Sequence, residues 1–234
     1  MSPTANPVGG THKEVRIYMY VPAQPAQPTL ALAPVEIAVT ATPSFAAPGT
    51  GRRLRIALHV HRARLNVLAD RTTSVAGTLS PGLAGRKVTL QALGNRGWRT
   101  IARARSRSGG RFRIRYVPRQ TGSERVRLAF AGDATDLPAH RRLGRLNVYR
   151  VAEASWYGGG GSLACGGSLT SSTLGVANKT LPCGTLVTLR YGARTVRVPV
   201  VDRGPYVAGR EYDLTEATKQ ALGFGDTGAV WSTR

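Results

Sequence analysis

Two aspartates stand close together in the stretch PVVDRGPYVAGREYDLTEA, residues 199–217. Asp202 ends an apolar run just before a Gly-Pro turn, and Asp213 follows it by eleven residues. Cleavage of a glycosidic bond needs a general acid at the bridging oxygen and negative charge near an oxocarbenium-like transition state. A pair of carboxylates can supply both. Asp202 can equally accept the hydrogen bond of a turn, and Asp213 can cap a helix, so both interpretations stay open.

The residues after Asp213 have the pattern of a helix start. Glu216 lies three positions on, as in an N-cap with its reciprocal partner. An apolar stripe then ends at Gly223, a residue suited to a helix stop. The stripe comprises Leu214, Ala217, Ala221 and Leu222. We expect Asp213 to cap this helix and to remain ionised through its amide hydrogen bonds, which leaves Asp202 as the general acid.

The only cysteines are Cys165 and Cys183, and both lie in glycine-containing segments. The four histidines all lie upstream of residue 141. A zinc site would lack ligands at workable spacing, so we expect no metal and no cofactor. An even cysteine pair in a loop-rich segment favours one disulfide and an oxidising compartment. Two buried free thiols are the alternative.

Composition divides the chain into three parts. Residues 1–53 are rich in Pro, Ala, Gly and Thr without a sustained period, which favours a disordered leader and linker. Within them, residues 29–47 look like a degraded signal sequence. No run reaches about 18 apolar residues, so no transmembrane helix is expected.

Residues 54–149 alternate between apolar and polar side chains. In RFRIRY (111–116) and RVRLAF (125–130) the arginines face one side and the apolar residues the other, which is typical of half-buried strands. Further strands are expected at 72–79, 87–93, 98–105 and 143–149. Short strands at a spacing of roughly 10 residues predict a β-sandwich. The stretch 108–134 resembles the Ig-like modules that precede wall-acting domains in secreted bacterial proteins.

Charge is concentrated in the first part of the chain. Of a net charge of +21, residues 1–150 hold 25 Lys or Arg against 6 Asp or Glu, and residues 151–234 hold 8 against 6. Such an excess favours an anionic partner, for example an anionic wall polymer on the sandwich, although a solvated sheet face is the alternative. Nucleic acid is disfavoured, because the arginines alternate along strands without clustered aromatics and the cysteine pair favours export.

Residues 151–234 carry four motifs in a fixed order. They are ASWYG (154–158), GVANKTLPCGT (175–185), VPVVDRGPYVAGREYDLTEA (198–217) and ALGF (221–224). Together they resemble the rare lipoprotein A (RlpA-like) double-psi β-barrel family, which is related to expansins and barwin-type domains. The resemblance implies a six-stranded barrel, with strands expected at 153–157, 185–191 and 195–201 beside the short helix. The overall fold class is therefore mainly all-β.

The resemblance also implies roles for individual residues. Asp202 matches the catalytic aspartate, and Asp213 matches an aspartate of expansins and of related transglycosylase barrels. Asn178 is the third residue expected at the catalytic site. It stands where transglycosylase members have a histidine, and asparagine can bind a sugar hydroxyl or orient Asp202 but cannot titrate. Cys165 and Cys183 match positions that are paired in actinobacterial members.

Aromatic and polar residues in the same motifs are candidates for sugar binding, because aromatic faces pack on apolar sugar patches. Neighbours along a strand point to opposite faces, and of Trp156 and Tyr157 we favour Tyr157 for the sugar side. The full set of expected substrate-binding residues is Trp156, Tyr157, Lys179, Thr180, Arg203 and Tyr206.

These observations predict a secreted, wall-associated protein that binds peptidoglycan or another wall glycan. Two activities stay open. A lytic transglycosylase lets the sugar's own hydroxyl attack, so one carboxyl acting first as acid and then as base suffices. An expansin-like module would bind or loosen the wall without cleavage, and Asn178 in place of the histidine favours this alternative.

Overall fold

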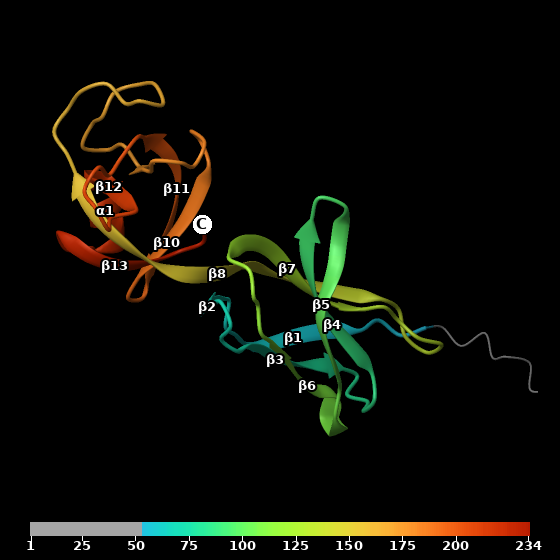
Figure 1. The fold of residues 1–234 in the computed structure, drawn as a ribbon. Coiled ribbons are helices and arrows are strands. Elements are labelled where there is room, and N and C mark those ends of the chain that lie inside the picture. The colour runs from blue at the N-terminus through green and yellow to red at the C-terminus, as the bar shows by residue number, and fades with distance from the viewer. Residues whose placement is uncertain (1–52) are drawn as a thin grey trace, which may run out of the picture. The chain divides into compact units, whose positions relative to one another are not determined.

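The structure, a computed structural model, describes residues 53–234 (Figure 1). The predicted leader and its signal-like segment lie outside the described residues, apart from Arg53. Strands dominate the described chain, which confirms the predicted mainly-β class. No helix in residues 53–234 is long and apolar enough to cross a membrane.

The first half forms two sheets. Its elements are β1 (Ala57–Ala63), β2 (Asn66–Leu68), β3 (Thr73–Ser80), β4 (Lys87–Gly94), β5 (Gly97–Arg105), the short 3-10 turn η1 (Ser108–Gly110), β6 (Arg111–Tyr116) and β7 (Gly122–Phe130). One sheet has the order β1-β3-β6, and the other joins β5, β4, β7 and the start of β8. The predicted strands are present, with ends shifted by a few residues.

One hydrophobic core lies between these two sheets. Val75 and Ile114 contribute from the first sheet, and Leu90 and Leu128 from the second, all at most 2% exposed. Their strand neighbours point outward, as the period-2 pattern predicts. Sheet-on-sheet packing is the arrangement of a β-sandwich. The likeness to Ig-like modules remains a prediction.

The second half is a closed sheet. Its elements are β8 (Ala139–Tyr157), β9 (Val176–Ala177), β10 (Leu186–Tyr191), β11 (Arg194–Asp202), β12 (Tyr212–Thr215), α1 (Glu216–Leu222) and β13 (Thr227–Ser232). The order β12-β9-β11-β10-β13-β8 closes because β12 also pairs with β8 in parallel. Six strands therefore form the barrel that the sequence predicts, around a core that includes Val176, Leu189 and Leu214.

A single long strand joins the sequence-predicted segments 143–149 and 153–157. β8 runs without a break from Ala139 to Tyr157, pairing with β7 through Val148 and with β13 from Arg150. The change of composition near residue 150 is therefore a change of pairing partner within one strand. The division into domains at this position stays a prediction.

The predicted helix exists, but the prediction that Asp213 caps it is wrong. Asp213 and Leu214 belong to β12, where they pair with both β8 and β9. The helix N-cap is Thr215, and its hydroxyl bonds Gly175 rather than the helix amides. Ladder hydrogen bonds on two sides therefore outweigh the local capping pattern. The predicted stop is confirmed, since Gly223 is left-handed at φ 61°.

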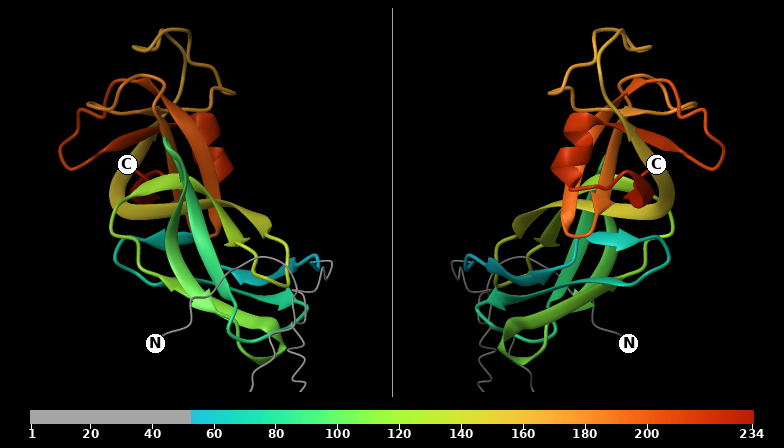
Figure 2. Two further views of the ribbon diagram at one scale, coloured as in Figure 1. Left: turned by 90° about the vertical axis from the view of Figure 1, so that its right-hand side faces the viewer. Right: turned by 90° about the vertical axis from the view of Figure 1, so that its left-hand side faces the viewer.

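The long connection between β8 and β9, residues 158–175, extends beyond the end of the barrel in both views of Figure 2. It returns at Gly175, which packs against Val201. A Cβ built at Gly175 would lie 2.4 Å from Val201 Cγ2. The buried hydroxyls of Thr215 and Thr218 also hold Gly175 through its N–H and its carbonyl. The entry to β9 is thus fixed from two sides.

We expect Gly175→Ala to lower the free energy of unfolding by about 2 kcal/mol, because the added methyl overpacks against Val201. Gly160→Ala is the matched control, since a Cβ there meets nothing within 4 Å. Thermal and urea unfolding of both variants measure the effect. Equal stability of the two variants would contradict this account of the β8–β9 connection.

Candidate active site

The two aspartates lie on either side of one residue of the barrel. Ala177 in β9 pairs with Asp202 of β11 on one side and with Asp213 of β12 on the other. On the side of Asp213 away from Ala177, Asp213 pairs with Ser155 of β8. Laterally paired residues point to the same sheet face. Register therefore directs the side chains of Asp202 and Asp213 to one side of the barrel wall.

A β-bulge gives Asp202 this direction. Val200 pairs with Val176, yet the next residue of β9 pairs with Asp202 rather than with Val201. The extra residue reverses the alternation, so Asp202 takes the face that Val201 would otherwise occupy. Two strand spacings then separate Asp202 and Asp213, a Cα distance of roughly 10 Å.

Asp202 is anchored by backbone amides. Its Oδ1 accepts the N–H groups of Ala164 at 2.9 Å and of Arg203 at 2.8 Å. Within residues 53–234, no protein group bonds Oδ2. Amide donors of this kind were expected at Asp213, and the structure places them at Asp202 instead. One oxygen fixes the carboxyl group, and the other is left for a ligand.

Asp213 has a different environment. Its Oδ1 accepts a hydrogen bond from the Ser155 hydroxyl, and no backbone amide contacts the carboxyl group among the described residues. A hydroxyl can rotate and can also accept a hydrogen bond, so it tolerates either protonation state of its partner. Ser155 is not among the residues expected from the sequence. The alternation within ASWYG would have indicated it, because Ser155 shares a strand face with Tyr157.

Tyr157 brings a phenol to the two carboxylates. Its hydroxyl is buried beside the Asp202 carboxylate, without a hydrogen bond of good geometry among the described residues. Burial raises the pKa of Tyr157 far above its ordinary value, and the negative charges of Asp202 and then Asp213 raise it further. The phenol is therefore a neutral O–H donor at neutral pH. A buried polar atom normally has a hydrogen-bond partner, and this O–H is placed to donate to one.

Both the nitrogen and the oxygen of the Asn178 side-chain amide form hydrogen bonds within the fold. Nδ2 donates to the carbonyl of Glu211 at 3.0 Å, and Oδ1 accepts the N–H groups of Thr180 at 3.0 Å and Leu181 at 2.8 Å. The residue is 8% exposed. These bonds shape the turn that follows β9. The catalytic role expected for this position stays a prediction, and its side-chain contacts favour a positioning role.

The two predicted cysteines form a disulfide, with a Cα–Cα distance of 5.5 Å. Cys165 follows Ala164, whose amide contacts Asp202, and its own N–H donates to the Val201 carbonyl at 3.2 Å. The bridge thus ties the β8–β9 connection to the segment after β9, close to Asp202. A disulfide between cysteines 18 positions apart stabilises the fold by about 3 kcal/mol.

Arg203 also holds the segment that follows β9. Its Nη1 donates to the carbonyls of Asn178 at 3.0 Å and Leu181 at 2.8 Å, and Nη2 lies 3.2 Å from the Cys183 sulfur. The guanidinium is therefore engaged within the protein. Its expected contact with substrate stays a prediction.

The remaining predicted binding residues do not all lie together. Tyr206 is 81% exposed beside Gly204, in the turn after Asp202. Lys179 and Thr180 are exposed in the turn after β9. Trp156 faces the other side of β8, where the Lys219 ammonium lies 3.7 Å from its ring centroid. Trp156 Nε1 also donates to the Asp226 carboxylate. The separation of Trp156 and Tyr157 agrees with the strand alternation.

Among residues 53–234 there is no cluster of His, Cys, Asp or Glu that could hold a metal ion. The reactive side chains gathered on this side of the barrel wall are two carboxyl groups, one phenol and one serine hydroxyl. Such groups can transfer protons and can stabilise a positive charge.

Residues 150–231 match the protein family described as "Lytic transglycolase". Over 82 residues the chain is 42% identical to "Probable endolytic peptidoglycan transglycosylase RlpA" of Aquifex aeolicus, covering 33% of this chain and 36% of that protein. A protein of the same name from Synechocystis is 36% identical over 107 residues, covering 39% and 33%. The chain thus spans about a third of the length of these curated relatives.

A solved structure, "Streptomyces papain inhibitor (SPI)", also resembles part of the chain. The identity is 24%, the TM-score is 0.30, and the match covers 36% of this chain and 91% of that one. A likeness at this level carries no conclusion about the site.

We expect Tyr157→Phe to reduce the loss of stability at alkaline pH. The folded state raises the pKa of Tyr157, so its stabilising effect is complete below the ordinary tyrosine value of 10.0 and is lost as the pH rises above it. Urea unfolding at neutral pH and at about pH 11 measures the difference. The exposed Tyr206→Phe serves as the control and should keep the wild-type loss. An unchanged alkaline loss in Tyr157→Phe would show that its phenol is not buried.

We expect Asn178→Ala to lower the free energy of unfolding by about 2 kcal/mol, because the buried groups that it bonds lose their partner. Lys179→Ala, at the exposed neighbouring position, should change it by less than about 0.5 kcal/mol. Urea unfolding of both variants tests this. If the two variants are equally stable, the positioning role of Asn178 is wrong.

Proposed function

Because residues 150–231 form an RlpA-like double-psi β-barrel, we propose that this barrel binds peptidoglycan glycan strands outside the cell and cleaves them as a lytic transglycosylase. The observation that carries the proposal is the pairing of Asp202 and Asp213 on either side of Ala177. The names of the two RlpA relatives support the substrate class. The disulfide supports an oxidising compartment.

Asp213 is the proposed acid and base. As acid, it gives its proton to the bridging oxygen while the bond from that oxygen to the anomeric carbon breaks. The cleaved strand leaves with the new hydroxyl. A hydroxyl of the same sugar then bonds the anomeric carbon and gives its proton to the Asp213 carboxylate, which restores the acid. The Ser155 hydroxyl suits both stages, because it can donate to the carboxylate or accept from the acid.

Asp202 is the proposed electrostatic stabiliser. Two backbone amides donate to its Oδ1 and hold the carboxyl group in place. A fixed negative charge facing the anomeric carbon stabilises the positive charge that develops there. These roles reverse the sequence-based assignment, in which amide contacts were expected at Asp213.

Two tyrosines complete the proposed site. The neutral phenol of Tyr157 can donate to a sugar oxygen between the carboxyl groups, which would satisfy its buried hydroxyl. The exposed ring of Tyr206, four residues after Asp202, offers a surface on which a sugar ring can stack. Both contacts hold the glycan across the Ala177 row.

A second candidate function is favoured by Asn178. The position at which transglycosylase relatives have a titrating histidine here carries an amide whose nitrogen and oxygen both form hydrogen bonds within the fold. The barrel would then bind and loosen glycan strands without cutting them, as expansin-like modules do. In that case, Asp202 and Asp213 would accept hydrogen bonds from sugar hydroxyls.

Digestion of purified sacculi separates the two functions. The intact protein should release products with an anhydro ring, detectable by mass spectrometry. Asp213→Asn should lower the rate at least about 100-fold, because the acid is lost, and Asp202→Asn should lower it through loss of charge. Asp226→Asn is the matched control, since this exposed carboxylate lies by Trp156 on the other side of β8.

Binding to sacculi without anhydro products would reject the transglycosylase and support the loosening module. Products that persist in both Asp202→Asn and Asp213→Asn would reject the assignment of the site. Circular dichroism confirms that each variant is folded before its rate is compared.

A further inference from the structure

The sandwich carries a cationic outer surface that the barrel chemistry does not use. In the sheet of β5, β4, β7 and the start of β8, alternate residues face the core, and their neighbours face outward. We name the outward side the β4 face. Register places these cations on it: Lys87, Arg103, Arg105, Arg125, Arg127, His140, Arg142 and Arg145. Within these paired strand positions, the β4 face has no Asp or Glu.

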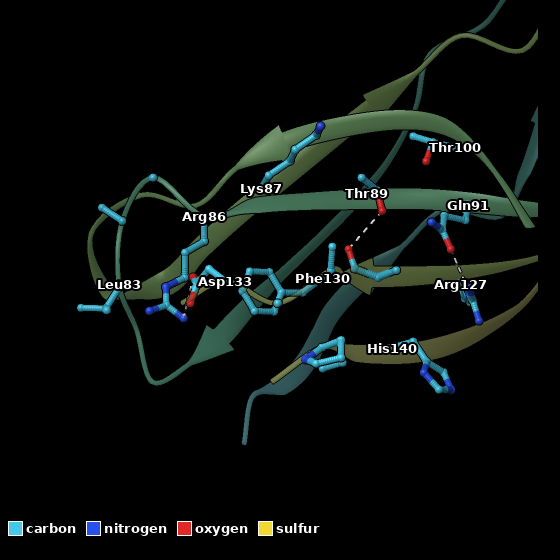
Figure 3. A pocket seen from close by; sticks show the side chains of 17 residues that line it. Leu83, Arg86, Lys87, Thr89, Gln91, Thr100, Arg127, Phe130, Asp133 and His140 are labelled. Carbon is cyan, nitrogen blue, oxygen red and sulfur yellow. Dashed lines mark hydrogen bonds and ion pairs between the residues drawn. The ribbon is translucent and has the colours of Figure 1, made fainter. Parts of the chain in front are cut away.

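A pocket of about 950 Å³ opens on the β4 face (Figure 3). Lys87, Arg127 and His140 line it together with the polar side chains of Thr89 and Gln91. The pocket also has one acidic residue at its end. That residue, Asp133, already accepts the N–H groups of Thr135 and Asp136, and it lies 3.7 Å from Arg86. The pocket therefore offers mainly positive charge and hydrogen-bond donors.

Arg127 is preorganised to bind an anion. Its Nε donates to Gln91 Oε1 at 2.8 Å, and its guanidinium lies 4.2 Å from the ring centroid of Trp98. These contacts hold the plane of the guanidinium and leave its Nη atoms without a hydrogen-bond partner among the described residues. A planar guanidinium held in this way matches the oxygens of a phosphate.

The cations form a two-dimensional array. Arg103 pairs with Thr89, and Arg142 pairs with Arg127, so positive charge spans four neighbouring strands. Strands lie about 4.8 Å apart, and alternate residues along a strand lie about 6.7 Å apart. A single small anion would use only one or two of these groups. A linear chain of anionic groups can contact several of them at once.

The surroundings of the array distinguish among the anionic ligands that could contact several cations at once. Proteins that bind single-stranded nucleic acid stack bases on aromatic rings, and the ring of Trp98 on this face is already covered by Arg127. A lipid surface would favour exposed apolar side chains, and of the large ones exposed in residues 53–234 only Leu83 borders the pocket. The disulfide in the same chain favours an extracellular ligand.

We propose that the β4 face is a second binding site, for a linear phosphodiester polymer without stacking bases, such as an anionic polymer of the cell wall. The site is independent of catalysis by the barrel. It would attach the protein to the wall while the barrel acts on glycan.

The opposite sheet supplies a matched control. Arg111, Arg113 and Arg115 are exposed on β6, pair with β3, and do not line the pocket. Lys87, Arg103 and Arg142 are also exposed, and none of them has a side-chain hydrogen bond or an ion pair among the described residues. Changing either set to glutamine removes the same charge at exposed positions, so both variants should fold.

The test measures binding of the full chain to a synthetic glycerol-phosphate oligomer across a range of salt concentrations. The variant Lys87→Gln/Arg103→Gln/Arg142→Gln should bind at least about tenfold more weakly than wild type near 50 mM salt, with a salt slope smaller by about 2. The variant Arg111→Gln/Arg113→Gln/Arg115→Gln should retain the wild-type slope. Thermal unfolding verifies that both are folded.

Equal losses in both variants would overturn the proposal, because net charge alone would then explain binding. Absence of binding by the wild type would also overturn it. A single-stranded oligonucleotide of equal charge and an anionic vesicle are tested in parallel. If either binds the β4 face more tightly than the glycerol-phosphate oligomer does, the commitment to a wall polymer is wrong.

Discussion

The candidate site depends on a strand of two residues. β9 pairs with β11 on one side and with β12 on the other, and Ala177 is the residue at which both pairings meet the aspartates. Its side chain is small and 2% exposed, so it adds little bulk between Asp202 and Asp213. Because β9 is so short, its position is set by its neighbours: the Thr215–Thr218 hydroxyls bond Gly175 before it, and the Asn178 amide bonds the turn after it.

Around this strand, structural groups and groups available to a ligand are clearly separated. The structural groups are the disulfide and the side chains of Arg203 and Asn178, which donate to backbone carbonyls. They fix the segments that lie beside Asp202. Among residues 53–234, the groups of this site without a hydrogen bond of good geometry are one oxygen on each aspartate and the buried phenol of Tyr157. The charge is divided in a similar way along the chain. The barrel residues are nearly neutral, whereas residues 1–150 carry an excess of +19, which suits the proposed glycan and polyanion ligands respectively.

The sequence predicts those parts of the structure that depend on local pattern. Alternation located the strands such as RFRIRY, and the ordered motifs indicated the barrel, because both depend on residues close in sequence. The sequence pattern fails where pairing between strands that are distant in sequence decides the position of a residue. The capping signal at Asp213 was outweighed by ladders to β8 and β9, and the bulge that turns Asp202 is visible only in its register with β9. Asn178 likewise looks available to a ligand in the sequence, because its three hydrogen-bond partners are visible only in the structure.

The central claim is that glycan binds across Ala177, between the two carboxyl groups. A crystal structure of the full chain carrying Asp213→Asn, soaked with a peptidoglycan-derived oligosaccharide, tests it most directly. The account predicts a bridging oxygen within hydrogen-bond reach of position 213, an anomeric carbon facing Asp202, the Tyr157 hydroxyl bonded to a sugar oxygen, and a sugar ring against Tyr206. An oligosaccharide bound along Trp156, or away from the Ala177 row altogether, would contradict it.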